Sequence, residues 1–300
     1  MGKYGELSKR TPGGNSSIST TRPNSGTWRC GVPWTSGGIE FNVGLLGHSL
    51  SCAAGVDHHT QDNADGSVSC FVGTTDWSSG TRWWVDICLP ADAAWFRTRT
   101  CWYNDSSADT SYYAWSNAGV RASGGLEYIF PGHAYLGHDG RAHQWPVDGE
   151  GHDLSKYAQN DFGHYKSYHV IGSVSDFWGC YWREEDLGMA HYTAYDQRPG
   201  KKIWIWGLSR YGMIWEDLLT DGDGQYSEVQ SGRLFNQSIS ASSATPFKHR
   251  AFLPCAFDSH DEYWMPVPGL GGLRYASKEL SFFVEGCSCG YAPTSPCMGC

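Results

Sequence analysis

The chain has 300 residues, of which 18% are charged, and its formal net charge is −9. An acidic chain without clustered Lys and Arg is a poor candidate for binding nucleic acid or an anionic membrane surface. It contains no apolar run of about 18 residues, the length that a membrane-spanning helix needs. The N-terminus has no apolar secretory segment, and most of the 11 cysteines stand singly in apolar stretches. We therefore expect a reduced, cytoplasmic protein.

The predicted elements in chain order are almost all short strands. Residues 1–27 are rich in Ser, Thr, Gly, Pro and Asn, which predicts a flexible arm. From Trp34 onward, β-like runs alternate with turn clusters, without a repeat or alternating helices. This pattern predicts one all-β domain, an antiparallel sandwich, over residues 28–285. The candidate strands are 37–43, 67–73, 82–89, 94–103, 111–120, 126–130, 166–172, 177–182, 188–195, 201–207, 225–232, 249–257, 262–267 and 280–286.

Three segments depart from this strand pattern. Apolar residues at helical spacing after Ser209, a plausible N-cap, predict one short helix over 209–219. Residues 137–165 are polar and rich in His and Gly, and a loop of that length is often functional. Residues 286–300 have no apolar periodicity and predict an irregular, Cys-rich tail.

The sequence gives little support for a metal or a cofactor. The tail holds Cys287-x-Cys289 and Cys297-x-x-Cys300, which could bind zinc, but their spacing matches no standard zinc module. The acidic stretch 220–228 lacks the ligand positions of an EF-hand loop and fits a tight turn better. The histidines show no spacing that brings them together. The chain also lacks a nucleophile elbow, a P-loop and a dinucleotide fingerprint, so we expect neither metal nor cofactor.

Several candidate strands instead carry polar or aromatic residues opposite an apolar face. In 201–207, Ile203 and Ile205 point to one side and Trp204 and Trp206 to the other. On a concave sheet such faces would form a cup of hydrogen-bonding groups and flat apolar walls, which suits a sugar. An ordinary sheet with one solvated face is the alternative, but it predicts Lys, Glu and Thr outside rather than paired Trp. The other faces are Tyr226, Glu228 and Gln230; His191, Thr193 and Tyr195; and Ser167 with His169.

Carboxylates and histidines on such strands suit general acid–base chemistry, whereas paired carboxylates would suit glycoside hydrolysis. Glu228 is the preferred base or nucleophile, and His191 or His169 the preferred acid. Glu262, Glu40 and Asp223 are further carboxylates for either scheme. The expected stacking walls are Trp204, Trp206 and Trp115, and the expected hydroxyl-orienting residues are Asn117, Gln230, Arg233 and Glu262.

Several stretches of the chain resemble an uncharacterised bacterial family, the domain of unknown function 5107. They are WTSGGIEFN, SYYAWSNAGV, KSYHVIG, FWGCYW, EYWMPVPGLGG and, most specifically, the block over 199–237. The resemblance runs over about residues 33–285. That family is grouped with the galactose-mutarotase-like β-supersandwiches and is often joined to tetratricopeptide repeats. In addition, YSEVQSGRLFN resembles a mutarotase strand that reads Gln-x-Tyr-Thr-Gly, with Gln230, Ser231 and Gly232 in the matching places.

The resemblance implies a β-supersandwich with a carbohydrate ligand on a concave sheet and a possible tetratricopeptide-repeat partner. Mutarotases use a His as acid and a Glu as base, but the motifs around those residues are not matched here. We therefore expect acid–base chemistry at the anomeric region of a sugar or oligosaccharide, by epimerisation or hydrolysis. The alternative is a non-catalytic carbohydrate-binding or scaffold module, possibly a truncated family member. A purely structural domain would be favoured if both Trp204 and Trp206 were fully buried.

Overall fold

A computed structural model describes residues 38–43, 48–49, 55–77, 79–123, 125–206, 208, 210, 212–213, 216, 224–236 and 251–285. These residues form antiparallel strands in two large sheets, with two short 3-10 helices, η2 (Tyr157–Asn160) and η3 (Arg183–Glu185). Within them, no helix is long and apolar enough to cross a membrane.

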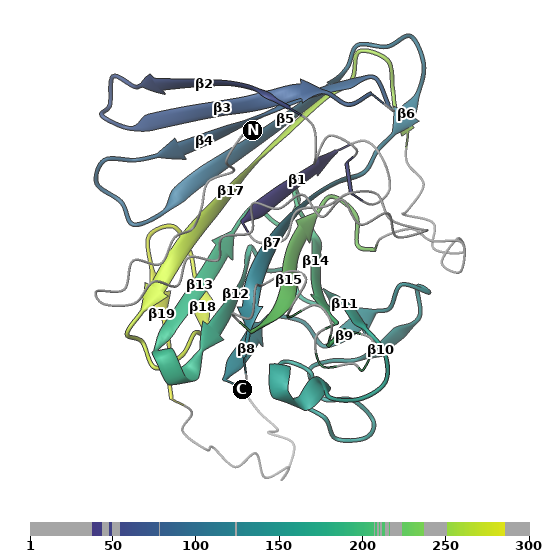
Figure 1. Ribbon diagram of the computed structural model, residues 1–300, viewed down its shortest axis with the longest axis vertical. Coiled ribbons are helices and arrows are strands. Elements are labelled where there is room, and N and C mark those ends of the chain that lie inside the picture. Colours follow the sequence, from purple (N-terminus) through teal and green to yellow (C-terminus); the bar gives the residue numbers. More distant parts are fainter. Residues whose placement is uncertain are drawn as a thin grey trace, which may run out of the picture.

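The strands divide between a seven-stranded and an eight-stranded sheet (Figure 1). The seven-stranded sheet has the order β1 (Ile39–Val43), β7 (Ala114–Ala122), β15 (Gln225–Gly232), β14 (Gly200–Ile205), β11 (Lys166–Ile171), β9 (Ala134–Leu136) and β10 (Ala142–Gln144). The eight-stranded sheet has the order β2 (Asp57–Asp62), β3 (Val68–Thr75), β4 (Thr81–Leu89), β5 (Phe96–Asn104), β17 (Phe257–Pro268), β13 (Leu187–Tyr192), β12 (Phe177–Trp182) and β8 (Leu126–Ile129). Two small pairs, β6 (Thr110–Ser111) with β16 (Ala251–Phe252) and β18 (Tyr275–Ala276) with β19 (Ser281–Phe282), complete the fold.

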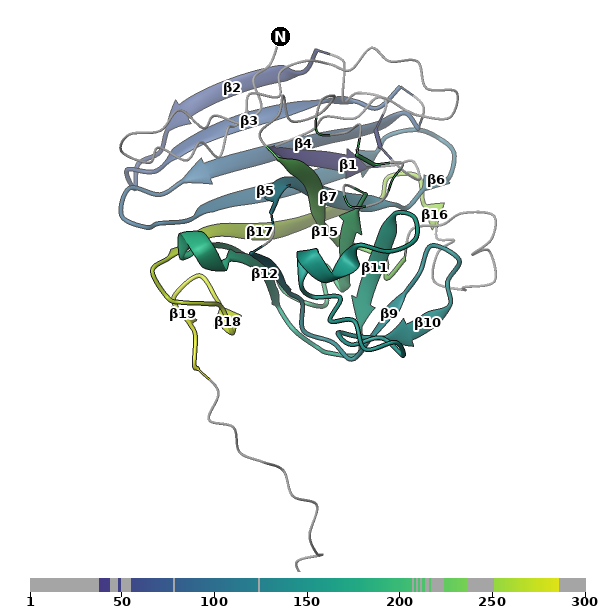
Figure 2. The ribbon, with the colours of Figure 1, turned by 60° about the horizontal axis from the view of Figure 1, so that its bottom comes forward.

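Strands far apart in the sequence become neighbours in both sheets. The long strand β17 lies between β5 and β13, and Figure 2 shows β2, β3, β4, β5 and β17 as successive strands. In the seven-stranded sheet, β7 lies between β1 and β15. This topology brings residues from strands far apart in the sequence onto one sheet face.

The apolar core lies between the two sheets. From the seven-stranded sheet, Ile203, Ile205 and Val229 are at most 1% exposed and belong to the same buried cluster as Trp102 and Trp264 of the eight-stranded sheet. Because strand side chains alternate, the residues between these positions point to the opposite side of the sheet. We call the face toward the core the inner face and the opposite one the outer face.

The all-β expectation is confirmed, whereas some elements were not predicted. β2 and the pair β9–β10 are strands that the sequence pattern did not indicate, and β10 lies within the segment 137–165 that we expected to be a loop. Of the helix expected over 209–219, only residues 210, 212, 213 and 216 are described, so that prediction lies outside the described residues. The arm at 1–27 and the tail at 286–300 lie outside them as well.

Candidate functional site

One row of polar side chains crosses five neighbouring strands on the outer face of the seven-stranded sheet. Strand register places Glu40 of β1 opposite Asn117 of β7, and Asn117 opposite Gln230 of β15. Gln230 in turn lies opposite Lys202 of β14, and Lys202 opposite His169 of β11. We call Glu40, Asn117, Gln230, Lys202 and His169 the polar row. Each of the five is at most 7% exposed.

A second row on the same face adds the preferred base and one indole. Glu228 lies opposite Trp204, and Trp204 lies opposite Ser167. The Gln230 amide donates a hydrogen bond of 2.7 Å to Oε2 of Glu228, which ties this row to the polar row. The outer face thus brings Glu228, His169, Trp204, Asn117 and Gln230 together, as the alternating pattern predicts.

The carboxylates of this face are held by hydrogen bonds. Oε2 of Glu40 lies 2.8 Å from Nδ1 of His48 and accepts a longer bond of 3.4 Å from Asn117. Nδ1 of His169 lies 3.0 Å from the carbonyl oxygen of Leu136. Because a carbonyl oxygen only accepts, Nδ1 of His169 carries the proton. This bond fixes the tautomer and the orientation of the ring.

Burial and neighbouring charge shift the protonation of these groups. Burial raises the pKa of Glu228, although His48 and Lys202 partly oppose it. Burial also lowers the pKa of Lys202 to about 8, against the attraction of Glu228. For His48, burial acts to lower the pKa, but the hydrogen bond and charge of Glu40 outweigh it and raise the pKa. The site therefore holds several groups with perturbed proton affinity, a feature common at functional sites.

Aromatic rings flank the polar row. Trp204 is half-buried and stacks on Tyr165, with ring centroids 4.6 Å apart and planes at 20°. Trp206 is also half-buried and meets Trp204 edge to face, whereas Trp115 is only 5% exposed. Trp204 and Trp206 are therefore not fully buried. A purely structural domain was favoured only if both were, so that condition is not met.

Two buried polar atoms on this face have no hydrogen-bond partner among the described residues. They are Oδ1 of Asn117 and the hydroxyl of Tyr226. Burial raises the pKa of Tyr226 well above its usual range, and Glu228 and Asn117 also act on this pKa. An unpaired buried polar atom is costly, and a ligand hydroxyl or a water molecule would satisfy it.

Two predicted site residues, His191 and Glu262, lie elsewhere, between the sheets. Both are 0% exposed, and Nε2 of His191 is 2.9 Å from Oε1 of Glu262. Glu262 also accepts a bond of 2.6 Å from Ser116, which points inward from β7 of the opposite sheet. His191 and Glu262 belong to β13 and β17 of the eight-stranded sheet and face the core. The structure therefore does not bring them to Glu228, which projects from the outer face of the seven-stranded sheet.

Arg233 also has a partner outside the polar row. It follows β15 and makes a two-pronged ion pair with Asp258 of β17, in which Nε lies 2.8 Å from Oδ2 and Nη2 is 2.5 Å from Oδ1. A guanidinium held in this way supports the junction between the sheets.

Sequence reasoning missed Lys202, His48 and His138 as site residues and gave Glu40 only a secondary place. His138 lies in the long segment 137–165, and its ring centroid is 5.4 Å from those of His169 and Trp204. For Glu40 a signal was present, because it lies between the core residues Ile39 and Phe41 in β1, whereas Lys202 follows another lysine in β14. No such signal marks His48, which follows β1 outside any strand.

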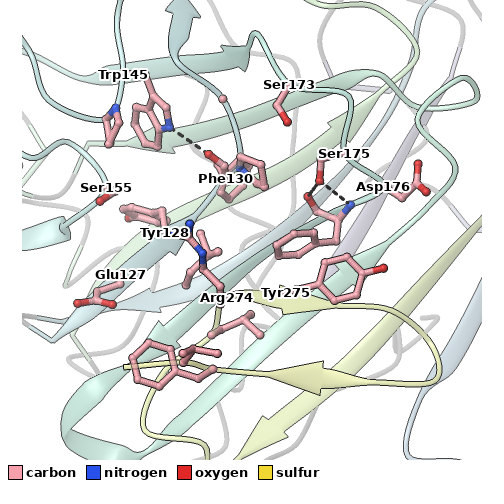
Figure 3. Close-up of a pocket in the computed structure, with 18 of the residues that line it drawn as sticks. Glu127, Tyr128, Phe130, Trp145, Ser155, Ser173, Ser175, Asp176, Arg274 and Tyr275 are labelled. Atoms are coloured by element: carbon pink, nitrogen blue, oxygen red, sulfur yellow. Dashed lines mark hydrogen bonds between the residues drawn. The ribbon is translucent and has the colours of Figure 1, made fainter. Parts of the chain in front are cut away.

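A separate hollow of about 1130 Å³ lies beside β8 and β12 (Figure 3). Phe130, Trp145 and Phe177 contribute apolar walls, with Asp176 and Arg274 among the polar lining. Trp145 donates a 3.0 Å hydrogen bond to the carbonyl of Phe130. No member of the polar row lines this hollow.

The two packed antiparallel sheets form a β-sandwich, a fold that the chain shares with a galactose mutarotase-like protein. A galactose mutarotase-like protein from Clostridium acetobutylicum has a TM-score of 0.50 at 10% identity, covering 73% of this chain and 68% of that one. Residues 27–267 match the family described as Domain of unknown function (DUF5107), and the chain belongs to this family. The resemblance seen in the sequence is thereby confirmed.

Two other solved structures share the fold. A TPR-domain containing protein from Parabacteroides distasonis has a TM-score of 0.64 at 23% identity, over 77% of this chain. This chain spans only 37% of the length of that protein. The Slr1438 protein from Synechocystis has a TM-score of 0.51 at 9% identity, over 77% of this chain and 78% of that one. Likeness at such identities shows the fold alone.

Proposed function

We propose that the outer face of the seven-stranded sheet binds a carbohydrate and acts on its anomeric centre by acid–base chemistry without a cofactor. The observation that carries this proposal is the polar row, five buried polar side chains in register across five strands and flanked by indoles. A sugar offers hydroxyls to such groups and a C–H face to a flat ring. The fold shared with a galactose mutarotase-like protein supports the same class of ligand.

In this proposal Glu228 is the base, and His169 is the acid that replaces His191 in that role. Ring opening of an aldose needs a proton removed from the anomeric hydroxyl and a proton delivered to the ring oxygen. Glu228 is suited to the first step because its raised pKa increases its proton affinity. His169 is assigned to the second because it is the histidine of the polar row and its ring is oriented by the bond of Nδ1 to Leu136. When the ring closes again on the other face of the carbonyl group, both proton transfers are reversed and the opposite anomer forms.

Anomeric NMR of a panel of aldoses tests this role. We expect Glu228→Gln to lose the acceleration of anomer exchange by about 10²–10⁴-fold, since a positioned base contributes that much. The matched control is Glu150→Gln, because the Glu150 side chain is 82% exposed and outside the site. Full activity of a folded Glu228→Gln protein would remove Glu228 from catalysis.

The second candidate is a carbohydrate-binding or scaffold module without chemistry. It is favoured by the pairing of the site carboxylates, since Glu228 already accepts from Gln230 and Glu40 already bonds His48. Such pairing fixes acceptors for a ligand rather than freeing a base. Titration calorimetry separates the two functions, because the module predicts glycan binding that Glu228→Gln retains and no anomer exchange in any variant.

We further propose a tetratricopeptide-repeat partner, because this chain covers 37% of the length of a TPR-domain containing protein. Sedimentation of the purified chain with the repeat portion of that Parabacteroides distasonis protein tests the idea. A single faster-sedimenting species supports the pairing, and two independent species contradict it.

A further inference from the structure

Lys202 lies within the polar row, with Gln230 on one neighbouring strand and His169 on the other. Its ammonium lies over two indole rings, 5.1 Å from the centroid of Trp204 and 5.8 Å from that of Trp115. The residue is only 7% exposed. A lysine amine in such a place meets any ligand that fills the face.

The neighbouring residue, Lys201, provides a comparison within the same strand. Burial lowers the pKa of both amines to about 8. Lys201, however, projects from the opposite side of β14, where its Nζ bonds the carbonyl of Ser175 and lies 5.7 Å from the Tyr195 ring. The two lysines therefore share basicity and differ in position, so that a difference in reactivity reports on the site.

We propose that Lys202 is an amine nucleophile that captures the carbonyl carbon of an open-chain sugar as an imine. This inference rests on the proposed function, because ring opening at the anomeric centre exposes that carbonyl. In the first step Nζ forms a bond to the carbonyl carbon, and the C=O π electrons move to oxygen. A proton passes from nitrogen to that oxygen, which gives a carbinolamine. The hydroxyl then takes a proton and leaves as water, and the nitrogen loses its remaining proton, so that the products are one imine and one water.

The surroundings of Lys202 suit each part of this sequence. Glu228, whose charge acts on Lys202, can give a proton to the leaving hydroxyl and take one from nitrogen. Its raised pKa increases the fraction of the protonated form at neutral pH. The indoles of Trp115 and Trp204 limit water and stabilise a protonated imine by cation–π attraction.

Reductive trapping on the wild-type chain tests the proposal. The probe is glyceraldehyde, a three-carbon hydroxyaldehyde without a stable monomeric ring form, with sodium cyanoborohydride at pH 8 and peptide mass spectrometry. At that pH about half of the Lys202 amines are neutral, roughly a hundredfold more than for an ordinary surface lysine. We expect Lys202 to be modified at least tenfold faster than Lys201 and roughly a hundredfold faster than the partly exposed Lys156.

The outcomes separate this proposal from the proposed function. Equal labelling of Lys202 and Lys201, or no label on Lys202, overturns the amine nucleophile even if Glu228-dependent anomer exchange is present. Selective labelling of Lys202 without anomer exchange supports the nucleophile and contradicts the proposed function. Thermal unfolding verifies that the Lys202→Met variant is folded. In this variant the selective label is expected to disappear. In Lys201→Met the label on Lys202 is expected to remain.

Discussion

Burial raises the pKa of Glu228, and the amide of Gln230 beside it acts in the opposite direction. Its bond of 2.7 Å to Glu228 stabilises the ionised form and so acts to lower the pKa, whereas burial raises it. We therefore predict that Gln230→Ala moves the acid limb of the anomer-exchange pH profile to higher pH. The exposed Gln144→Ala in β10 is the control and should leave the profile unchanged. A profile identical in Gln230→Ala and the wild type would show that this bond does not tune Glu228.

At the scale of single residues, strand alternation predicted the shared face of Glu228 and Gln230 and the opposite placement of Ile203 and Trp204. It did not identify Lys202 as a buried site residue, because a lysine next to another lysine fits a solvated surface equally well. Burial distinguishes the two cases, and burial depends on what packs over the sheet. His48 was missed for a related reason, since its contact with Glu40 joins two segments by side chains alone.

Strand β14 separates stability from binding on its two faces. Ile203 is 0% exposed in the core, and truncation of a buried Ile costs about 2–5 kcal/mol. Trp204 is half-buried and stacks on Tyr165, a contact worth about 1 kcal/mol beyond the area that the ring buries. We predict that Ile203→Ala lowers the free energy of unfolding, measured by urea denaturation, by more than Trp204→Ala does. Equal losses, or a larger loss for Trp204→Ala, would contradict the assignment of the two faces.

At the scale of elements, long amphipathic strands were predictable and short polar ones were not. Every residue of β2, DHHTQD, is exposed, so it has no alternation of apolar and polar positions to detect. β9 and β10 have only three residues each, and β10 lies in a stretch dominated by His, Gly and Asp. These strands are specified by pairing with their neighbours rather than by their own sequence.

The buried charges between the sheets predict an acid limit to stability for the whole molecule. Burial lowers the pKa of His260 to about 4 and also lowers that of His191. The unfolded chain therefore binds more protons than the folded one below about pH 6.5, and the stability present above that pH falls as pH falls toward 4. Burial acts to raise the pKa of Glu262, but Arg198 and His191 hold it well below its usual range, so Glu262 adds a loss below about pH 4.5.

Urea denaturation at a series of pH values between 7.5 and 4.5 checks this prediction. For His260 alone the expected loss is of the order of 3 kcal/mol once the pH is below 4, with part of it visible by pH 4.5. His260→Gln should flatten the dependence, whereas the exposed His143→Gln should not. A free energy of unfolding that stays constant over this range would show that these histidines are not buried in neutral form.

At the scale of the whole molecule, the all-β class was predictable, but the division of strands between two sheets was not. His191 and Glu262 have polar strand neighbours much as Glu228 does, and alternation within a strand cannot say which sheet the strand joins. That choice depends on β17 pairing with β5 and β13, contacts between distant parts of the chain. One predicted site therefore became two places, an outer face with Glu228 and an interior cluster with Glu262.

Saturation-transfer difference NMR with a panel of mono- and oligosaccharides tests most directly that the outer face of the seven-stranded sheet holds a sugar. Trp84 of β4 provides the matched control, because it is 38% exposed on the other large sheet. The account predicts transfer to at least one saccharide in the wild type and in Trp84→Ala, and its loss in Trp204→Ala. Undiminished transfer in Trp204→Ala, or transfer that depends on Trp84 instead, would contradict it.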